Sequence, residues 1–176
     1  MRAKSKRSYV RNVALSALCA LLLAACGEKP ETMIASAKDY IAKNDRPAAT
    51  IQLKNALQKD ASLGEARYLL GKIYLEQGDY PGAEKELTRA FDAGYAPDQV
   101  VPLLAQTLVQ SGQGDKLATQ LANANLTQPE SKAALKTYEG LAALSKGKRD
   151  DAVAAFAAAL ELSPGFPLAR TSQVRL

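Results

Sequence analysis

Apolar and small residues recur at helical spacing along most of the chain, in segments that come in pairs. Turn-forming and helix-breaking residues separate these segments. Pro47 and Pro81 stand at matching helix starts, where a missing backbone N–H costs no hydrogen bond. The pattern predicts helices over residues 31–43, 47–59, 64–77, 81–93, 98–111, 115–125, 131–146 and 150–162.

The helix pairs repeat with a period of 34 residues. With Gly64 as position 1 of a unit, Gly71, Ala83 and Leu87 fall at positions 8, 20 and 24. Neighbouring units mostly keep small residues at positions 8 and 20, large apolar residues at 7, 11 and 24, and Gly or a polar residue near 15. Small residues allow the two helices of a unit to approach closely, and large ones fill the space between units. Because one unit cannot bury its apolar stripe alone, the period predicts a stack.

The stretch 66–74, followed by Gly78-Asp79-Tyr80, strongly resembles a tetratricopeptide repeat (TPR). The resemblance implies an all-α fold, a TPR α-solenoid of about four helix-turn-helix units. Arg67 replaces the aromatic residue usual at position 4, so we expect atypical packing between units there. Leu117 replaces the small residue at position 20 of the third unit and should push its two helices apart. We assign the units to residues 30–63, 64–97, 98–132 and 133–166, with a truncated fifth unit over 167–176. From this last segment we expect the front portion of a longer array or a truncated gene product.

The N-terminal segment has the charge and hydropathy pattern of a secretory signal. Five basic residues within the first eleven precede an apolar run over residues 13–25. At 13 residues this run is shorter than the roughly 20 that span a bilayer as a helix. We therefore assign residues 1–25 to a signal peptide, residues 26–30 to a tether and residues 31–176 to the TPR array.

The end of that run, Leu23-Ala24-Ala25-Cys26, resembles the signal of bacterial lipoproteins. The resemblance implies cleavage after Ala25 and covalent lipid, such as palmitate, on Cys26. Several acyl chains anchor a protein stably. Gly27, in place of the aspartate that retains lipoproteins at the inner membrane, favours the outer membrane. The alternative is an ordinary cleaved signal in which Cys26 is incidental.

Charge and composition exclude several function classes. Of 23 basic residues, five lie in the signal, which leaves 18 to balance the 18 acidic residues. No basic stripe is visible, so nucleic acid is not expected as a partner. The sequence has no histidine, which excludes a Ser-His-Asp triad, a Cys-His pair and a histidine metal site. We expect a binding protein that is not an enzyme and uses no cofactor or metal.

In TPR arrays the first helix of each unit lines a concave groove, and the resemblance implies the same here. Pro102 and Ala134 hold groove positions towards the back, where the groove turns apolar. This mixture suits an extended or helical peptide from a protein partner. Packing alone is the alternative for Tyr68, and a solvated face is the alternative for Lys38 and Lys72. The carboxylate clamp of chaperone-binding members is missing. The candidate groove residues are Ile34, Lys38, Ile41, Glu65, Tyr68, Lys72, Leu75, Glu76, Gln106 and Gln110.

The stretches 34–40, 48–58, 65–71 and 100–105 are similar to the long TPR lipoproteins that accompany the exosortase/PEP-CTERM protein-sorting system. This resemblance implies a Gram-negative envelope, exopolysaccharide production and many more repeats. It favours a lipid-anchored, periplasm-facing adaptor that serves protein sorting or polysaccharide export. Two alternatives remain open: a TPR lipoprotein of outer-membrane barrel assembly, and one that assists pilus or secretin assembly.

Overall fold

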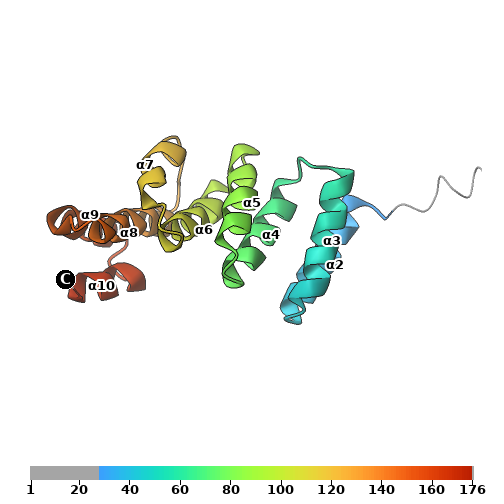
Figure 1. Cartoon of the computed structure of the whole chain (residues 1–176), viewed down its shortest axis with the longest axis horizontal. Coiled ribbons are helices and arrows are strands. Elements are labelled where there is room, and N and C mark those ends of the chain that lie inside the picture. Colours follow the sequence, from blue (N-terminus) through green and yellow to red (C-terminus); the bar gives the residue numbers. More distant parts are fainter. Residues whose placement is uncertain (1–27, 176) are drawn as a thin grey trace, which may run out of the picture.

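The computed structural model describes residues 28–175, and every regular element in that range is a helix. The helices follow one another in a long row, without closing around one centre (Figure 1). Cys26 and the proposed signal lie outside the described residues. No helix within residues 28–175 has the length and apolar character needed to cross a membrane. The elements are α2 (Pro30–Ala42), α3 (Arg46–Lys59), α4 (Gly64–Glu76), α5 (Tyr80–Asp92), α6 (Pro97–Gln110), the 3-10 turn η1 (Gly114–Lys116), α7 (Leu117–Gln120), α8 (Pro129–Ser145), α9 (Arg149–Leu162) and α10 (Pro167–Val174).

Seven of the predicted helices are confirmed, with boundaries within two residues of the prediction. The turn inside each unit is made at position 15, as the repeat pattern predicts. All four residues there adopt a positive φ, a conformation that glycine reaches without strain and asparagine tolerates. They are Asn44 (φ 60), Gly78 (φ 76), Gly112 (φ 74) and Gly147 (φ 71).

Side-chain caps start the second helices of the first two units. The carboxylate of Asp45 accepts a hydrogen bond from the backbone N–H of Ala48 at 3.1 Å. The carboxylate of Asp79 accepts from the N–H of Gly82 at 3.0 Å. Each bond satisfies a backbone donor that has no partner inside its helix, so the helix begins directly after the turn.

Two glycines at position 8 allow the helices of a unit to approach closely. A Cβ atom added to Gly71 would lie 2.7 Å from Cγ of Leu87. A Cβ atom added to Gly140 would lie 2.5 Å from Cε1 of Phe156, which is fully buried. The close approach predicted for the small residue at position 8 is confirmed, and the large residue that it contacts stands at position 24 of the same unit in both cases.

Within residues 28–175, the core extends along the row as three clusters of buried residues. The first cluster joins α2, α3 and α4, and the second runs from α4 to α8. Tyr74 packs against both, so α4 is the element through which the first unit is joined to the rest. A smaller cluster of Ala133, Ala159 and Ala169 holds α10 against α8 and α9. Close packing within each helix pair and contacts between neighbouring units therefore stabilise the stack together, as expected for a solenoid.

The helix predicted over residues 115–125 is wrong. The chain forms η1 and then only the four-residue α7 before it turns into an irregular segment that leads to α8. Leu117, at the position where other units carry alanine, is buried together with Leu121 and Leu126. These three leucines fill the core without a continuous helix, and the asparagines among them favour turns over helix interiors. Burial in the tertiary structure therefore decides this segment.

Asp98 at the start of α6 holds the end of that irregular segment. Its carboxylate accepts hydrogen bonds from the backbone N–H groups of Thr127 and Gln128, each at 3.0 Å, and from the Thr127 hydroxyl at 2.6 Å. The hydroxyl bond and the two backbone bonds hold the pKa of Asp98 below its usual range. The Ser131 hydroxyl also donates to the Asp98 carbonyl at 2.8 Å. These bonds set the position at which α8 begins.

Candidate functional site: the concave groove

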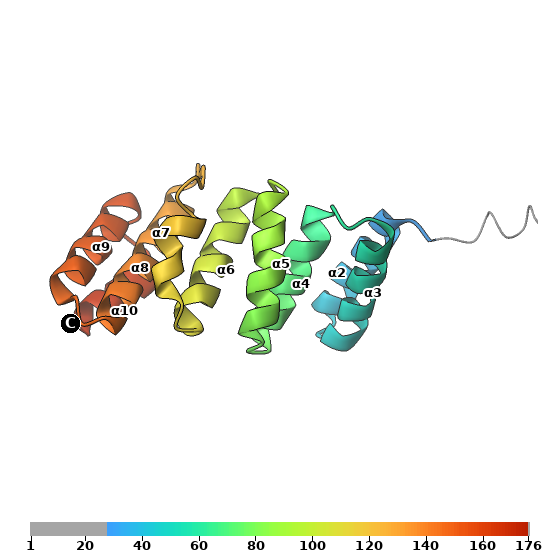
Figure 2. The same ribbon diagram turned by 45° about the horizontal axis from the view of Figure 1, so that its top comes forward.

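The first helices of the units and the second helices lie on opposite sides of the row. Figure 2 shows α3 and α5 in front of α2 and α4. The surface formed by α2, α4, α6 and α8 is called here the concave groove, and the residues predicted from the repeat pattern lie on three of these helices, α2, α4 and α6. The close packing of α4 against α5 and of α8 against α9 holds these first helices in place.

Ion pairs link the units at the front of the concave groove. Lys38 Nζ on α2 lies 2.5 Å from Glu65 Oε1 on α4, and both side chains remain partly exposed. Arg46 Nε at the start of α3 lies 2.8 Å from Glu76 Oε2 at the end of α4. Three of the predicted groove residues, Lys38, Glu65 and Glu76, are therefore paired with a neighbouring unit. Partly exposed pairs of this kind contribute little stability.

An aromatic pair lies beside these charges. The rings of Tyr68 and Tyr95 are 5.5 Å apart at a tilt of 38°. Burial raises the pKa of the Tyr68 hydroxyl, and burial together with the Glu65 carboxylate raises that of Tyr95. Both rings pack against the core while remaining partly exposed. Tyr95 is not among the groove residues predicted from the sequence, because it lies after α5, outside the groove positions of the repeat.

The structure corrects the placement of two predicted groove residues. Ile34 is only 5% exposed and Leu75 only 9%, and both belong to the core clusters. Their side chains pack between helices and are not available as groove surface. Ile41 is half-buried against the first cluster, and Lys72 is half-buried on α4.

An apolar pocket of about 260 Å³ lies at the back of the concave groove, between α6 and α8. Gln106 lines it, whereas Gln110 lies beyond it and is exposed. Phe166, the residue before α10, forms one side of the pocket, and Tyr138 forms another side. Burial raises the pKa of the Tyr138 hydroxyl. Glu130 is the only charged residue in the lining. The full lining is Pro102, Leu103, Gln106, Glu130, Ser131, Ala134, Tyr138 and Phe166.

Some residues of this pocket coincide with groove positions of the repeat. Pro102, Gln106 and Ala134 hold groove positions of their units and are among its lining residues. Tyr138 and Phe166 were missed as pocket residues. Phe166 is the last residue of the fourth unit, and nothing in the repeat pattern indicates that its ring would line a pocket between α6 and α8. The 3.6-residue period places Tyr138 on the same face as Ala134, so that signal was available.

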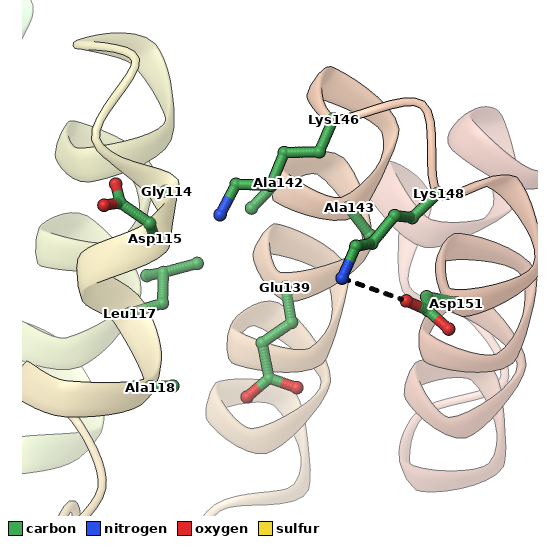
Figure 3. Close-up of a pocket in the computed structure, with 10 residues that line it drawn as sticks. All are labelled: Gly114, Asp115, Leu117, Ala118, Glu139, Ala142, Ala143, Lys146, Lys148 and Asp151. Carbon is green, nitrogen blue, oxygen red and sulfur yellow. Dashed lines mark ion pairs between the residues drawn. The ribbon is translucent and has the colours of Figure 1, made fainter.

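A second hollow of about 240 Å³ lies between η1–α7 and α8–α9, where the shortened helix leaves space (Figure 3). Lys148 Nζ faces Asp151 Oδ2 at 4.0 Å within it. Asp115, Glu139 and Lys146 add charges of both signs to its lining. Residues 28–175 contain no cluster of Cys, Asp and Glu able to hold a metal ion. Because charges of both signs are mixed in its open lining, this hollow favours no ligand class.

An all-helical stack of nested pairs with an open groove defines a solenoid scaffold for protein–protein interactions. The tetratricopeptide repeat family matches the chain over residues 40–101 and again over residues 139–166. The chain is a TPR-repeat protein. The gap between these matches contains η1 and α7, where the repeat pattern breaks down.

No curated protein matches the sequence significantly. Among solved structures, the chain is similar to YrrB, which is described as a TPR protein with an unusual peptide-binding site. The two share 18% identity with a TM-score of 0.48, over 81% of this chain and 90% of the other.

Proposed function

We propose that this protein is an envelope adaptor lipoprotein, anchored by lipid on Cys26 and facing the periplasm from the outer membrane. Its concave groove binds a peptide segment of a protein partner. The system it serves is exosortase/PEP-CTERM protein sorting and the associated exopolysaccharide export. The adaptor acts by binding, without catalysis and without a cofactor.

The apolar pocket between α6 and α8 is the observation that carries the binding role. Its lining is mostly apolar, it has room for one large side chain, and it opens on the same surface as the Tyr68–Tyr95 pair. A peptide in the concave groove would place an apolar side chain in the pocket and reach the Lys38–Glu65 charges with polar groups further along.

The anchoring role is supported by the Leu23–Cys26 motif and by the apolar run before it. The resemblance of stretches 34–40 and 100–105 to exosortase-associated lipoproteins supports the sorting context. The TPR fold accounts for binding, and the lipid would restrict that binding to the membrane surface.

Site-directed photo-cross-linking in cells tests the groove and the anchor together. A cross-linker replaces Gln106, which lines the apolar pocket, and a matched cross-linker replaces Ala154, which is exposed on α9. We expect distinct envelope proteins to be captured at Gln106 and not at Ala154. Equal capture at both sites would refute the groove.

Mass spectrometry of the mature N-terminus should show acylated Cys26, and the Cys26→Ala variant should leave the membrane fraction. A mature terminus without fatty acid would refute the anchor.

A further inference from the structure

A groove distinct from the concave groove lies on the opposite side of the row, between α3 and α5. Its volume is about 460 Å³, larger than the pocket between α6 and α8. Helix α4 forms its floor, where Leu70 and Tyr74 lie beside Leu57 of α3. Figure 2 shows the order of these helices along the row, with α4 between α5 and α3. We name this surface the α3–α5 groove.

A buried ion pair lies at the base of the α3–α5 groove. Arg67 Nη1 on α4 donates to Glu86 Oε2 on α5 at 2.6 Å, and both residues are almost fully buried. Arg67 also donates through Nε and Nη2 to the carbonyl of Ala61, at 2.9 and 2.5 Å. The two charges therefore neutralise each other, and neither is free to bind a ligand.

Three further cations stand around this neutral base. Lys54 projects from α3, whereas Lys85 and Arg89 belong to α5, and all three are exposed. Lys54 Nζ is 5.8 Å from the centre of the Tyr74 ring, and Lys85 Nζ is 3.5 Å from Glu86 Oε1. Glu86 is the only acidic residue among those that line the groove.

The positive charge of the α3–α5 groove is confined to this part of the surface. Residues 28–175 contain equal numbers of basic and acidic side chains, yet the lining of the α3–α5 groove has a net charge of about +3. An apolar floor between two cationic walls is complementary to a segment that alternates acidic and large apolar side chains. The floor would receive the apolar side chain, and Lys54 and Arg89 would pair with carboxylates on either side of it.

We propose that the α3–α5 groove is a second binding surface, which takes an acidic, unfolded segment of a protein partner. Anionic lipid fits less well, because the cations flank a hollow and a flat bilayer would reach only its rim. The proposal does not depend on the concave groove, since α3 and α5 contribute none of the residues of the α6–α8 pocket.

Fluorescence anisotropy with the full chain tests the proposal. The probe is a labelled peptide, Glu-Glu-Leu-Glu-Glu-Leu-Glu-Glu, and two control peptides replace every Glu by Lys or every Leu by Ser. The variant Lys54→Glu/Arg89→Glu reverses the charge on both walls. The matched control Lys29→Glu/Arg170→Glu makes the same change in net charge at exposed sites on other elements. Circular dichroism confirms that each variant is folded, and Lys54→Gln/Arg89→Gln serves as a milder variant.

We expect the acidic peptide to bind saturably and in a salt-dependent manner, with at least about tenfold weaker binding to Lys54→Glu/Arg89→Glu. The control variant should bind as the wild type does, and both control peptides should bind more weakly. The proposal is overturned if the acidic peptide does not bind, or if both charge-reversal variants lose binding equally. It is also overturned if the groove variant affects only binding to phosphatidylglycerol vesicles, which would assign the groove to lipid.

Discussion

The buried Arg67–Glu86 pair is the feature whose energetics can be tested most directly. The three perturbations are Arg67→Met, Glu86→Leu and the double variant, which replaces both charges by apolar side chains. The exposed pair Lys136–Glu139 on α8, with a distance of 2.7 Å, provides a matched control through Lys136→Met, Glu139→Leu and their combination.

The expected magnitudes follow from what each substitution leaves behind. Glu86→Leu leaves the Arg67 cation buried with only the Ala61 carbonyl as partner, which should cost about 3 kcal/mol. Arg67→Met leaves the Glu86 carboxylate with Lys85 as its remaining partner, at 3.5 Å, and removes both hydrogen-bond donors to the Ala61 carbonyl. The free energy of unfolding should therefore fall by about 3 kcal/mol. The double variant leaves no buried charge and should cost only about 1–2 kcal/mol, mainly through the lost bonds to Ala61.

Urea denaturation of the full chain, followed by circular dichroism, measures these costs. Because solenoid units can unfold in steps, the transition that contains α4 and α5 must be identified by amide hydrogen exchange. The coupling energy between Arg67 and Glu86 should exceed about 2 kcal/mol, whereas that of the control pair should stay below about 1 kcal/mol. Additive effects at Arg67 and Glu86, or a coupling no larger than in the control pair, would show that burial does not strengthen the pair.

Two further predictions concern packing and pH. Gly140→Ala should lower the free energy of unfolding, measured by urea denaturation, by about 2 kcal/mol, because the new Cβ would lie 2.5 Å from Phe156. The control is Gly165→Ala, whose new Cβ would have no atom within 4 Å and which should change the urea midpoint little. Asp98 has a lowered pKa in the folded state, so its contribution to stability is complete above the ordinary carboxyl pKa and is lost as the pH falls through the lowered value. The difference in urea midpoint between wild type and Asp98→Asn should therefore become smaller in acid. In the wild type, the Thr127 amide should also lose protection from hydrogen exchange as the pH falls. A difference in urea midpoint that is independent of pH would contradict the role of the carboxylate.

Much of the fold was predictable because it depends on local signals. The turn residues at position 15 and the caps Asp45 and Asp79 act within a few residues of themselves. The pairing of Gly71 with Leu87 joins adjacent helices, and the period repeats it in other units. The fold class and the boundaries of seven helices could therefore be predicted from the sequence.

Other features depended on how units are rotated against one another. The groove positions of the repeat include Ile34 and Leu75, but the packing between helices buries both. Arg67 was expected to disturb the packing between units, and only the structure shows that Glu86, 19 residues later, neutralises it.

The sequence by itself determined the helix pairs, their turns and the small-against-large contacts within a unit, because these require only neighbours along the chain. The tertiary structure decided the loss of the helix expected at 115–125, the burial of Ile34 and Leu75, and the reach of Phe166 to the pocket on α8. In each of these cases the free energy depends on how much surface is buried where helices pack against one another. A repeat pattern does not specify that amount, since it records which residues recur and not the angle at which successive units stack.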